Sequence, residues 1–127
     1  MDASQKDNQP PEPIQDLEAK PAGKGKVNLT WKAPRDNSGK AAAYQVKWAT
    51  LPIKTYEKYD YREDEGKARC WWRAQNVKGE PVPAEPGKKD SFTVEGLPTG
   101  TCYFAVCSDD AEMNQSDISN VVKVDVE

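Results

Sequence analysis

The sequence predicts an all-β domain, an antiparallel β-sandwich of about seven short strands. Apolar residues alternate with polar ones in several short segments, which is the period of a strand with one buried face. No segment repeats its apolar residues with the 3.6-residue period of an amphipathic helix. Ten prolines and frequent turn-forming clusters interrupt the chain too often for long helices. A length of 127 residues is room for one such domain.

The chain begins with a polar, proline-rich stretch. We therefore expect residues 1–12 to be an interdomain linker and residues 13–127 to be the domain. Ile14 and Leu17, which precede Pro21, are the expected anchors of a first, short edge strand.

Two strands follow, each with three apolar residues at alternate positions: Val27, Leu29 and Trp31 in the first, and Tyr44, Val46 and Trp48 in the second. Pro34 ends the first strand, and residues 36–39 (DNSG) between the two have turn chemistry. In the second strand Gln45 and Lys47 take the opposite, polar face.

Three more strands are predicted in the C-terminal part by the same alternation, at Phe92 and Val94, at Cys102, Phe104 and Val106, and at Val122, Val124 and Val126. Tyr103, Ala105 and Cys107 point to the other side of their strand. The predicted core gathers the inward positions of all these strands, namely Leu29, Trp31, Tyr44, Val46, Phe92, Leu97, Cys102, Phe104, Val106, Val122 and Val124.

Several spaced motifs occur in the order found in one known family. They are PIQDLEA (13–19), VNLTWKAP (27–34), YQVKW (44–48) and the long run that starts at SFTVEGLPTGT (91–101) and ends in SNVV (119–122). Together they resemble a fibronectin type III domain, of the kind found in large secreted bacterial proteins, over Pro13 to Val126. The resemblance implies an immunoglobulin-like sandwich of seven antiparallel strands.

Two departures from that family stand out. Its members usually carry a tyrosine after the Gly-Thr step, whose hydroxyl bonds back to the upstream backbone; here that position is Cys102. Tyr103 has the wrong parity to replace it, so we expect the bond to be absent or supplied otherwise. The second departure is the length of the connection between the strand at 44–48 and the strand at 92–94. This connection, residues 51–90, is long for the family, and the sequence leaves its fold open.

Most of the aromatic residues outside the predicted strands lie in this long segment. If Trp71 and Trp72 lie on a strand, they point to opposite sides, and an exposed one near Tyr59 or Tyr61 offers a flat apolar face to a sugar ring. These four residues are the candidate ligand or partner contacts. The alternative is that both tryptophans cover the edge of the sandwich, with Arg69 or Arg73 stacked on them.

The composition excludes several kinds of chemistry. Histidine is absent, which removes Ser-His-Asp and Cys-His catalysis and His-ligated zinc. There is no paired CxxC motif and no calcium-loop spacing, so we expect no catalytic residues, no metal and no cofactor. A net charge of −3 argues against nucleic acid, and no apolar run is long enough for membrane insertion.

The three cysteines, Cys70, Cys102 and Cys107, form an odd set. Either all are free thiols, or Cys70 pairs with Cys107 and one thiol is left over.

We therefore expect a non-catalytic accessory or spacer module of a larger secreted or surface protein, located outside the cell or at its surface. Its partners would be the neighbouring domains of the parent chain, with polysaccharide or another protein as further candidates, and the isolated fragment would be a monomer. The alternative is a carbohydrate-binding module that uses exposed aromatics of residues 51–90.

Overall fold

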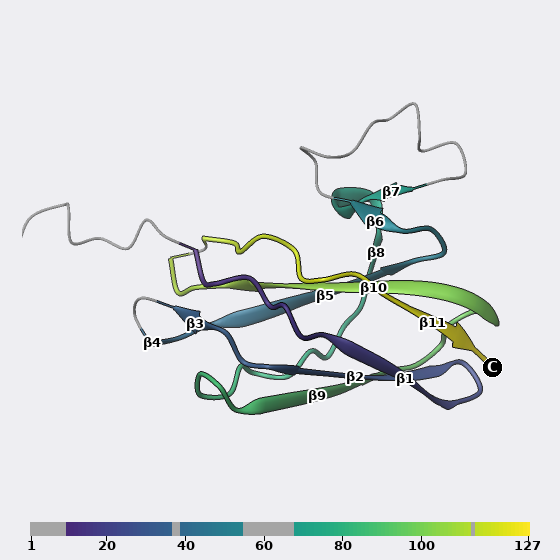
Figure 1. Cartoon of the computed structure of the whole chain (residues 1–127), viewed down its shortest axis with the longest axis horizontal. Coiled ribbons are helices and arrows are strands. Elements are labelled where there is room, and N and C mark those ends of the chain that lie inside the picture. The colour runs from purple at the N-terminus through teal and green to yellow at the C-terminus, as the bar shows by residue number, and fades with distance from the viewer. Residues whose placement is uncertain (1–9, 37–38, 55–67, 113) are drawn as a thin grey trace, which may run out of the picture.

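The computed structural model describes residues 10–36, 39–54, 68–112 and 114–127 of the chain. Its body is a sandwich of two antiparallel sheets, which lie as two layers in Figure 1. A third, smaller layer formed by β6, β7 and a short 3-10 helix lies above the four-stranded sheet. The predicted all-β antiparallel sandwich is confirmed.

The three-stranded sheet has the order β1–β2–β9, with β1 at Glu18–Gly23, β2 at Lys26–Lys32 and β9 at Lys89–Val94. The alternation in β2 works as predicted, because Val27, Leu29 and Trp31 are all completely buried. In β9 the inward Val94 is buried, while Phe92 is only half-buried.

The four-stranded sheet has the order β11–β10–β5–β8. These strands are β5 (Ala43–Ala49), β8 (Gln75–Asn76), β10 (Gly100–Asp109) and β11 (Val122–Val126). Their register places Phe104 opposite Trp48 and Val106 opposite Val46. Three strands in one sheet and four in the other give the seven that the family resemblance implies.

Four short strands form two further pairs. β3 (Arg35–Asp36) and β4 (Gly39–Lys40) make an antiparallel hairpin between β2 and β5. β6 (Ile53–Lys54) and β7 (Arg69–Cys70) pair in parallel, and η2 (Trp71–Arg73) follows directly. In its described part, the long segment contributes the two-residue β8 and the first two residues of β9 to the main sheets.

The sandwich core contains most of the predicted residues. Fully or almost fully buried in it are Leu29, Trp31, Tyr44, Val46, Leu97, Cys102, Phe104, Val106 and Val124. Phe92 and Val122 are half-buried and pack against this core. Trp31 meets Tyr44 edge to face, with ring centroids 5.0 Å apart.

The start of the domain differs from the sequence prediction. Ile14 and Leu17 are buried, but β1 begins after them and contains Pro21. Residues 14–17 are instead fixed by Asn120, whose side-chain oxygen accepts from the Leu17 N–H at 2.9 Å and whose amide donates to the Leu17 carbonyl at 3.0 Å. Pro21 is tolerated because β1 is an edge strand.

Two residues assigned to the linker pack on the domain. Pro11 is buried, and the Glu12 N–H donates to the Arg35 carbonyl at 2.9 Å. The remaining described linker residue, Pro10, is exposed, and residues 1–9 lie outside the described part of the chain.

Cys102, at the position where the family usually has a tyrosine, points into the sandwich as its place in the alternation predicts. Cys102 is completely buried in the sandwich, and β10 keeps the predicted register. Tyr103 is half-buried on the other side of the strand, where it packs against a buried cluster that contains Ala105 and Cys107. It does not take the place of the family's corner tyrosine.

The two ends of the described chain lie at opposite ends of the sandwich (Figure 1). At one end Glu12 bonds to Arg35 beside the β3–β4 hairpin. At the other, the Gly25 N–H donates to the Glu127 carbonyl at 2.8 Å, and the Gly25 carbonyl accepts from the Leu97 N–H at 3.0 Å. Gly25 has φ +67°, and a Cβ there would lie 3.2 Å from the Leu97 oxygen, so this junction requires glycine.

Candidate interaction sites

The first described part of the long segment covers the outer face of the four-stranded sheet. We call residues 50–54 and 68–74 the arm. The apolar residues that are buried between the arm and the four-stranded sheet are called the outer cluster. The outer cluster contains six buried residues, Ala49, Ile53, Trp71, Ala74, Ala105 and Cys107. Tyr103, Ile118 and Val121 pack around it. The small alanines let the arm approach the sheet closely, so this domain has a second apolar layer outside the sandwich.

This layer changes the interpretation of the candidate contacts. Trp71 is 3% exposed, and it lies in a 3-10 turn rather than on a strand, so its ring is not available to a ligand. Tyr59 and Tyr61 lie outside the described residues, as does the side chain of Trp72. Of the four predicted ligand contacts, only the Trp71 side chain lies in the described part of the chain, so the structure shows no two of them close together.

Lys47 is buried, although its position in the strand had predicted an exposed side chain. It was expected on the polar face of its strand, but it is 5% exposed because the arm lies over it. Its Nζ donates to the Trp71 carbonyl at 3.0 Å and lies 4.9 Å from the centroid of the Trp71 ring. The lysine thus fastens the arm to β5 through a hydrogen bond and a cation–π contact. The sequence had not indicated Lys47 as a cation placed over this tryptophan.

Cys102 and Cys107 are free thiols buried on opposite sides of β10. Cys107 points away from the sandwich core, as its parity predicted, but it is covered by the arm and does not carry the bridge to Cys70 considered above. Burial raises the pKa of Cys107 to about 12, and the negative charges of Asp109 and Asp117 add to this while Lys47 and Ser116 oppose it. Burial also raises the pKa of Cys102.

These buried thiols make stability sensitive to alkali. In the unfolded chain Cys107 would ionise near pH 9, whereas in the fold it keeps its proton until about pH 12. Stability from this thiol is therefore complete below pH 9 and decreases as the pH rises toward 12. We expect the free energy of unfolding to fall by about 2 kcal/mol between pH 9 and pH 11 from Cys107 alone. Urea titrations at both pH values, on the wild type and on Cys107→Ala, measure it; equal decreases in the two proteins would contradict the assignment.

A buried polar link joins the two sheets inside the sandwich. The Tyr44 hydroxyl donates to Asp90 Oδ2 at 2.6 Å, and the Ala84 N–H donates to the same oxygen at 3.2 Å. Tyr44 is on β5 and Asp90 is on β9, so the bond crosses between the layers. Burial, and then the hydrogen bond to Asp90, raise the pKa of Tyr44 well above its ordinary value. The link is a structural tie, since it lies inside the core.

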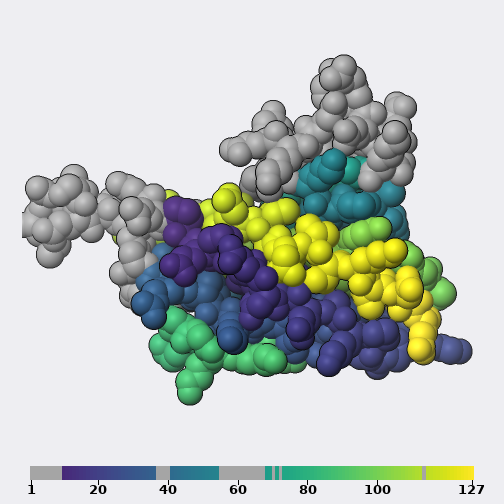
Figure 2. Space-filling model, viewed as in Figure 1, coloured from purple at the N-terminus to yellow at the C-terminus, as the bar shows by residue number. Residues whose placement is uncertain are grey.

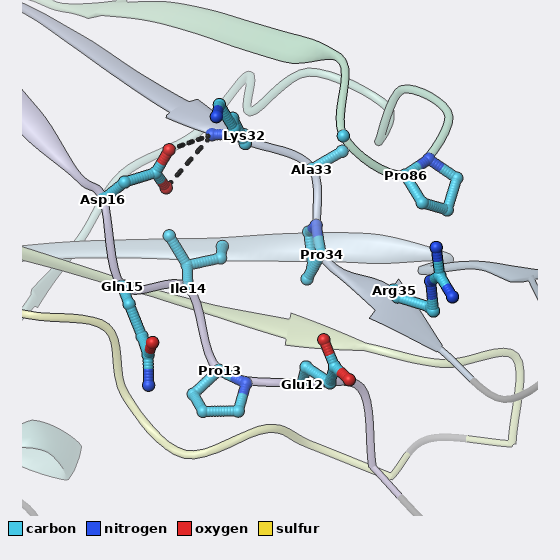
Figure 3. Close-up of a pocket in the computed structure, with 11 residues that line it drawn as sticks. Glu12, Pro13, Ile14, Gln15, Asp16, Lys32, Ala33, Pro34, Arg35 and Pro86 are labelled. Carbon is cyan, nitrogen blue, oxygen red and sulfur yellow. Dashed lines mark hydrogen bonds between the residues drawn. The ribbon is translucent and has the colours of Figure 1, made fainter.

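A pocket of about 470 Å³ lies where the chain enters the domain (Figure 3). Its walls come from three segments, residues 12–16, residues 32–35 and the turn at 86–87. Backbone hydrogen bonds fix these segments to one another, including Gly87 N–H to the Ala33 carbonyl at 3.0 Å. In Figure 3 the Asp16 carboxylate turns toward the Lys32 N–H, which donates to both of its oxygens at 3.2 Å.

The lining of this pocket carries charges of both signs. Glu12 and Asp16 supply two negative charges, and Lys32 and Arg35 supply two positive charges. Pro13, Pro34 and Pro86 also line it. Sequence reasoning missed this pocket, because residues 10–12 were assigned to a linker.

The described residues hold no group of three or more cysteine, aspartate or glutamate side chains placed to bind a metal ion. No helix in the described part of the chain has the length and apolar character needed to cross a membrane.

Comparison with known proteins agrees with this architecture. The family model of the fibronectin type III domain matches residues 10–122, and no match is found among curated proteins. Among solved structures, the chain is similar to the PKD domain of an M14-like peptidase from Thermoplasmatales archaeon SCGC AB-540-F20, with 16% identity and a TM-score of 0.56, covering 94% of this chain and 98% of that one.

Two further structures show the same fold. The sixth fibronectin type III domain of human fibronectin type III domain containing protein 3 has 15% identity and a TM-score of 0.53, with 95% of this chain and 90% of that one covered. The Clostridium perfringens spore cortex lytic enzyme SleM has 15% identity and a TM-score of 0.54 over 92% of this chain, which spans only 29% of the enzyme. With the seven-stranded sandwich and the family match over residues 10–122, the chain belongs to the fibronectin type III family.

Proposed function

We propose that this domain is a non-catalytic accessory module of a larger secreted or surface protein, and that it holds neighbouring domains at a fixed separation. The observation that carries the proposal is the placement of the two chain ends at opposite ends of the sandwich, each fastened by backbone hydrogen bonds. A linked domain on either side would therefore be held apart by the length of the strands.

The relatives support an accessory role. Fibronectin type III domains are generally non-catalytic, and two of the similar structures are parts of enzymes, a peptidase and a spore cortex lytic enzyme. The pocket at residues 12–16, 32–35 and 86–87 lies where a preceding domain would meet this one, so it is the proposed contact surface for that neighbour.

The alternative of carbohydrate binding through aromatics of residues 51–90 has less support. Of its four residues, Trp71 is the one whose side chain is described, and it is buried between the arm and the four-stranded sheet.

A distance measurement tests the spacer proposal. With donor and acceptor fluorescent proteins fused to the two ends, single-molecule energy transfer should give one narrow distance distribution. The ten-residue β10 sets the length of the domain, about 33 Å at roughly 3.3 Å per residue. The same fusion in 6 M urea serves as the control and should give a broad distribution, as expected of a flexible chain.

Two results would contradict the proposal. A distribution that is equally broad with and without urea would show that the domain does not fix the separation. Turnover of glycan or peptide substrates by the isolated domain would show that it is not a non-catalytic module.

A further inference from the structure

The two long sides of the sandwich are closed differently. On one side β1 and β11 lie next to each other, and Figure 2 shows the N-terminal segment in purple beside the C-terminal segment in yellow. The other side lies between β8 and β9, which are the last strands of their sheets. We call this second side the seam. Along it, the six-residue β9 has one edge that no strand of its own sheet covers.

The register of β9 with β2 shows which backbone groups lie on this open edge. The Ala33 N–H donates to the Lys88 carbonyl at 2.8 Å, and hydrogen-bonded pairs alternate with non-hydrogen-bonded pairs in an antiparallel ladder. Counting on along the register, the N–H and carbonyl groups of Lys89, Ser91 and Thr93 point away from β2, while those of the residues between them bond to it. Among the described residues, no hydrogen bond to these outward groups is found.

β9 has few of the features that protect an edge strand from pairing. Natural edge strands are often interrupted by proline or a β-bulge, or carry charged side chains. β9 contains no proline, and its register with β2 runs without a shift from Lys89 to Val94. The side chains exposed along its centre, Ser91 and Thr93, are neutral. The edge is therefore suited to pairing with a further extended strand.

Beside this edge, one half of the seam is an open groove of about 310 Å³. Its lining includes three apolar side chains that are only half-buried, Trp48, Val77 and Phe92. Residues 92–95 also line the groove, so it runs alongside the second half of β9. An apolar side chain carried by an added chain would complete the burial of this lining.

The other half of the seam is closed by the proline-rich segment that leads into β9. The Glu80 carboxylate accepts a hydrogen bond from the Val46 N–H at 3.1 Å, and the Ala84 N–H donates to Asp90 Oδ2 at 3.2 Å. Between these two anchors lies Val82, which is 78% exposed and is the one exposed large hydrophobic residue in the described part of the chain. A single exposed valine is ordinary. This one, however, stands on the closed half of the seam, beside the first half of β9.

We propose that two copies of this domain pair through β9, edge to edge and antiparallel. A two-fold axis at Ser91 places the Ser91 residues of the two copies opposite each other and Lys89 of each copy opposite Thr93 of the other. Each of these pairs exchanges two backbone hydrogen bonds, so every outward group is bonded. The closed half of one seam then meets the open half of the other, and Val82 of each copy lies against the apolar groove of the second copy.

The charges on the outer face of the sheet also fit this register. Lys89 lies diagonal to Glu95 of the second copy, which is within the reach of long side chains. Glu95 pairs with Lys26 of its own copy at 3.5 Å, so Lys89 would add a second cation to that carboxylate. A shift of two residues along the strand would leave some of the outward groups without a partner, so the register centred on Ser91 is the best satisfied. The pairing goes beyond the spacer role, and it differs from the monomer expected from the sequence.

Sedimentation velocity of the isolated domain, from micromolar to millimolar concentration, tests the proposal. We expect a reversible equilibrium between monomer and dimer, with a dissociation constant inside that range, because the interface is small. Val82→Ser should weaken the dimer about tenfold or more, since one apolar side chain from each copy leaves the groove of the other. Circular dichroism checks that each variant is folded.

The two-fold axis allows a more specific test at Ser91. Because Ser91 faces itself, Ser91→Lys places two ammonium groups together and Ser91→Asp places two carboxylates together, so each variant alone should dimerise about tenfold more weakly or worse. An equimolar mixture of the two variants should recover the dimer, since opposite charges then meet. The matched control is Thr30→Lys, which adds a charge beside Ser91 on the same face but on the inner strand β2. It should leave the dissociation constant within about twofold of the wild type.

Three outcomes would overturn the proposal. They are a wild type that stays monomeric at every concentration, dimerisation of both Ser91 variants as tight as that of the wild type, or a mixture of the two variants that remains monomeric. Binding of an extended heptapeptide to a wild type that stays monomeric would assign the edge to a foreign strand instead. Single-molecule energy transfer is measured at concentrations far below this range, so failure of the dimer and failure of the spacer role are separately detectable.

Discussion

Replacing Trp31 with alanine should lower the free energy of unfolding by about 3–5 kcal/mol, the usual cost of removing a buried large aromatic side chain. Trp31 is completely buried, and its ring packs at 86° against Tyr44 in the centre of the sandwich. A domain of this size has a total stability on the order of 5–15 kcal/mol, so the variant would fold marginally.

Urea unfolding followed by circular dichroism measures this loss, and Trp71→Ala is the matched comparison. Trp71 is also buried, but in the outer cluster. Because this cluster lies outside the sandwich core, we expect the arm to open while the sandwich stays folded. We expect Trp71→Ala to cost roughly half as much in global unfolding and to make the Cys107 thiol accessible to labelling. Equal losses in both variants, with Cys107 still protected, would mean that the arm and the sandwich unfold as one unit.

The second large effect is expected at Asp90. Asp90→Ala removes the acceptor for both the Tyr44 hydroxyl and the Ala84 N–H, and leaves two donors without their partner. Each unsatisfied buried donor costs about 1–3 kcal/mol, so we expect a loss of about 2–4 kcal/mol in the free energy of unfolding.

A double-mutant cycle with Tyr44→Phe isolates the bond between the two side chains. Tyr44→Phe removes only the hydroxyl, and it should cost about 1.5–3 kcal/mol because the bond is to a carboxylate. The double variant should lose less than the sum of the two single losses, by about 1 kcal/mol or more. Additive losses would show that the 2.6 Å contact contributes nothing to stability.

The sandwich itself could be predicted because its signal is local. Alternation in β2 and β10 assigns each side chain to a face, and burial of Leu29 and Phe104 follows once any second sheet covers that face. Pro21 shows the limit of such reasoning. Proline is compatible with an edge strand but does not reveal one, so β1 was expected too early in the chain.

The arm could not be predicted because its position depends on a distant surface. Lys47 stands at a polar position of β5, and nothing near it in the sequence indicates that a turn more than twenty residues later will cover it. The adjacent tryptophans suggested a strand, whereas Trp71 begins a 3-10 turn whose ring is buried by contact with β5 and β10.

The fastening of the chain ends also determines how this domain responds to pulling. In the proposed spacer role, tension applied through the two chain ends would act along the strands, because the chain enters at one end of the sandwich and leaves at the other. The five paired positions that join β11 to β10 are then loaded in shear and share the force, instead of opening one after another. Such a geometry resists extension until these bonds fail together, so the domain would transmit load between its neighbours before it lengthens.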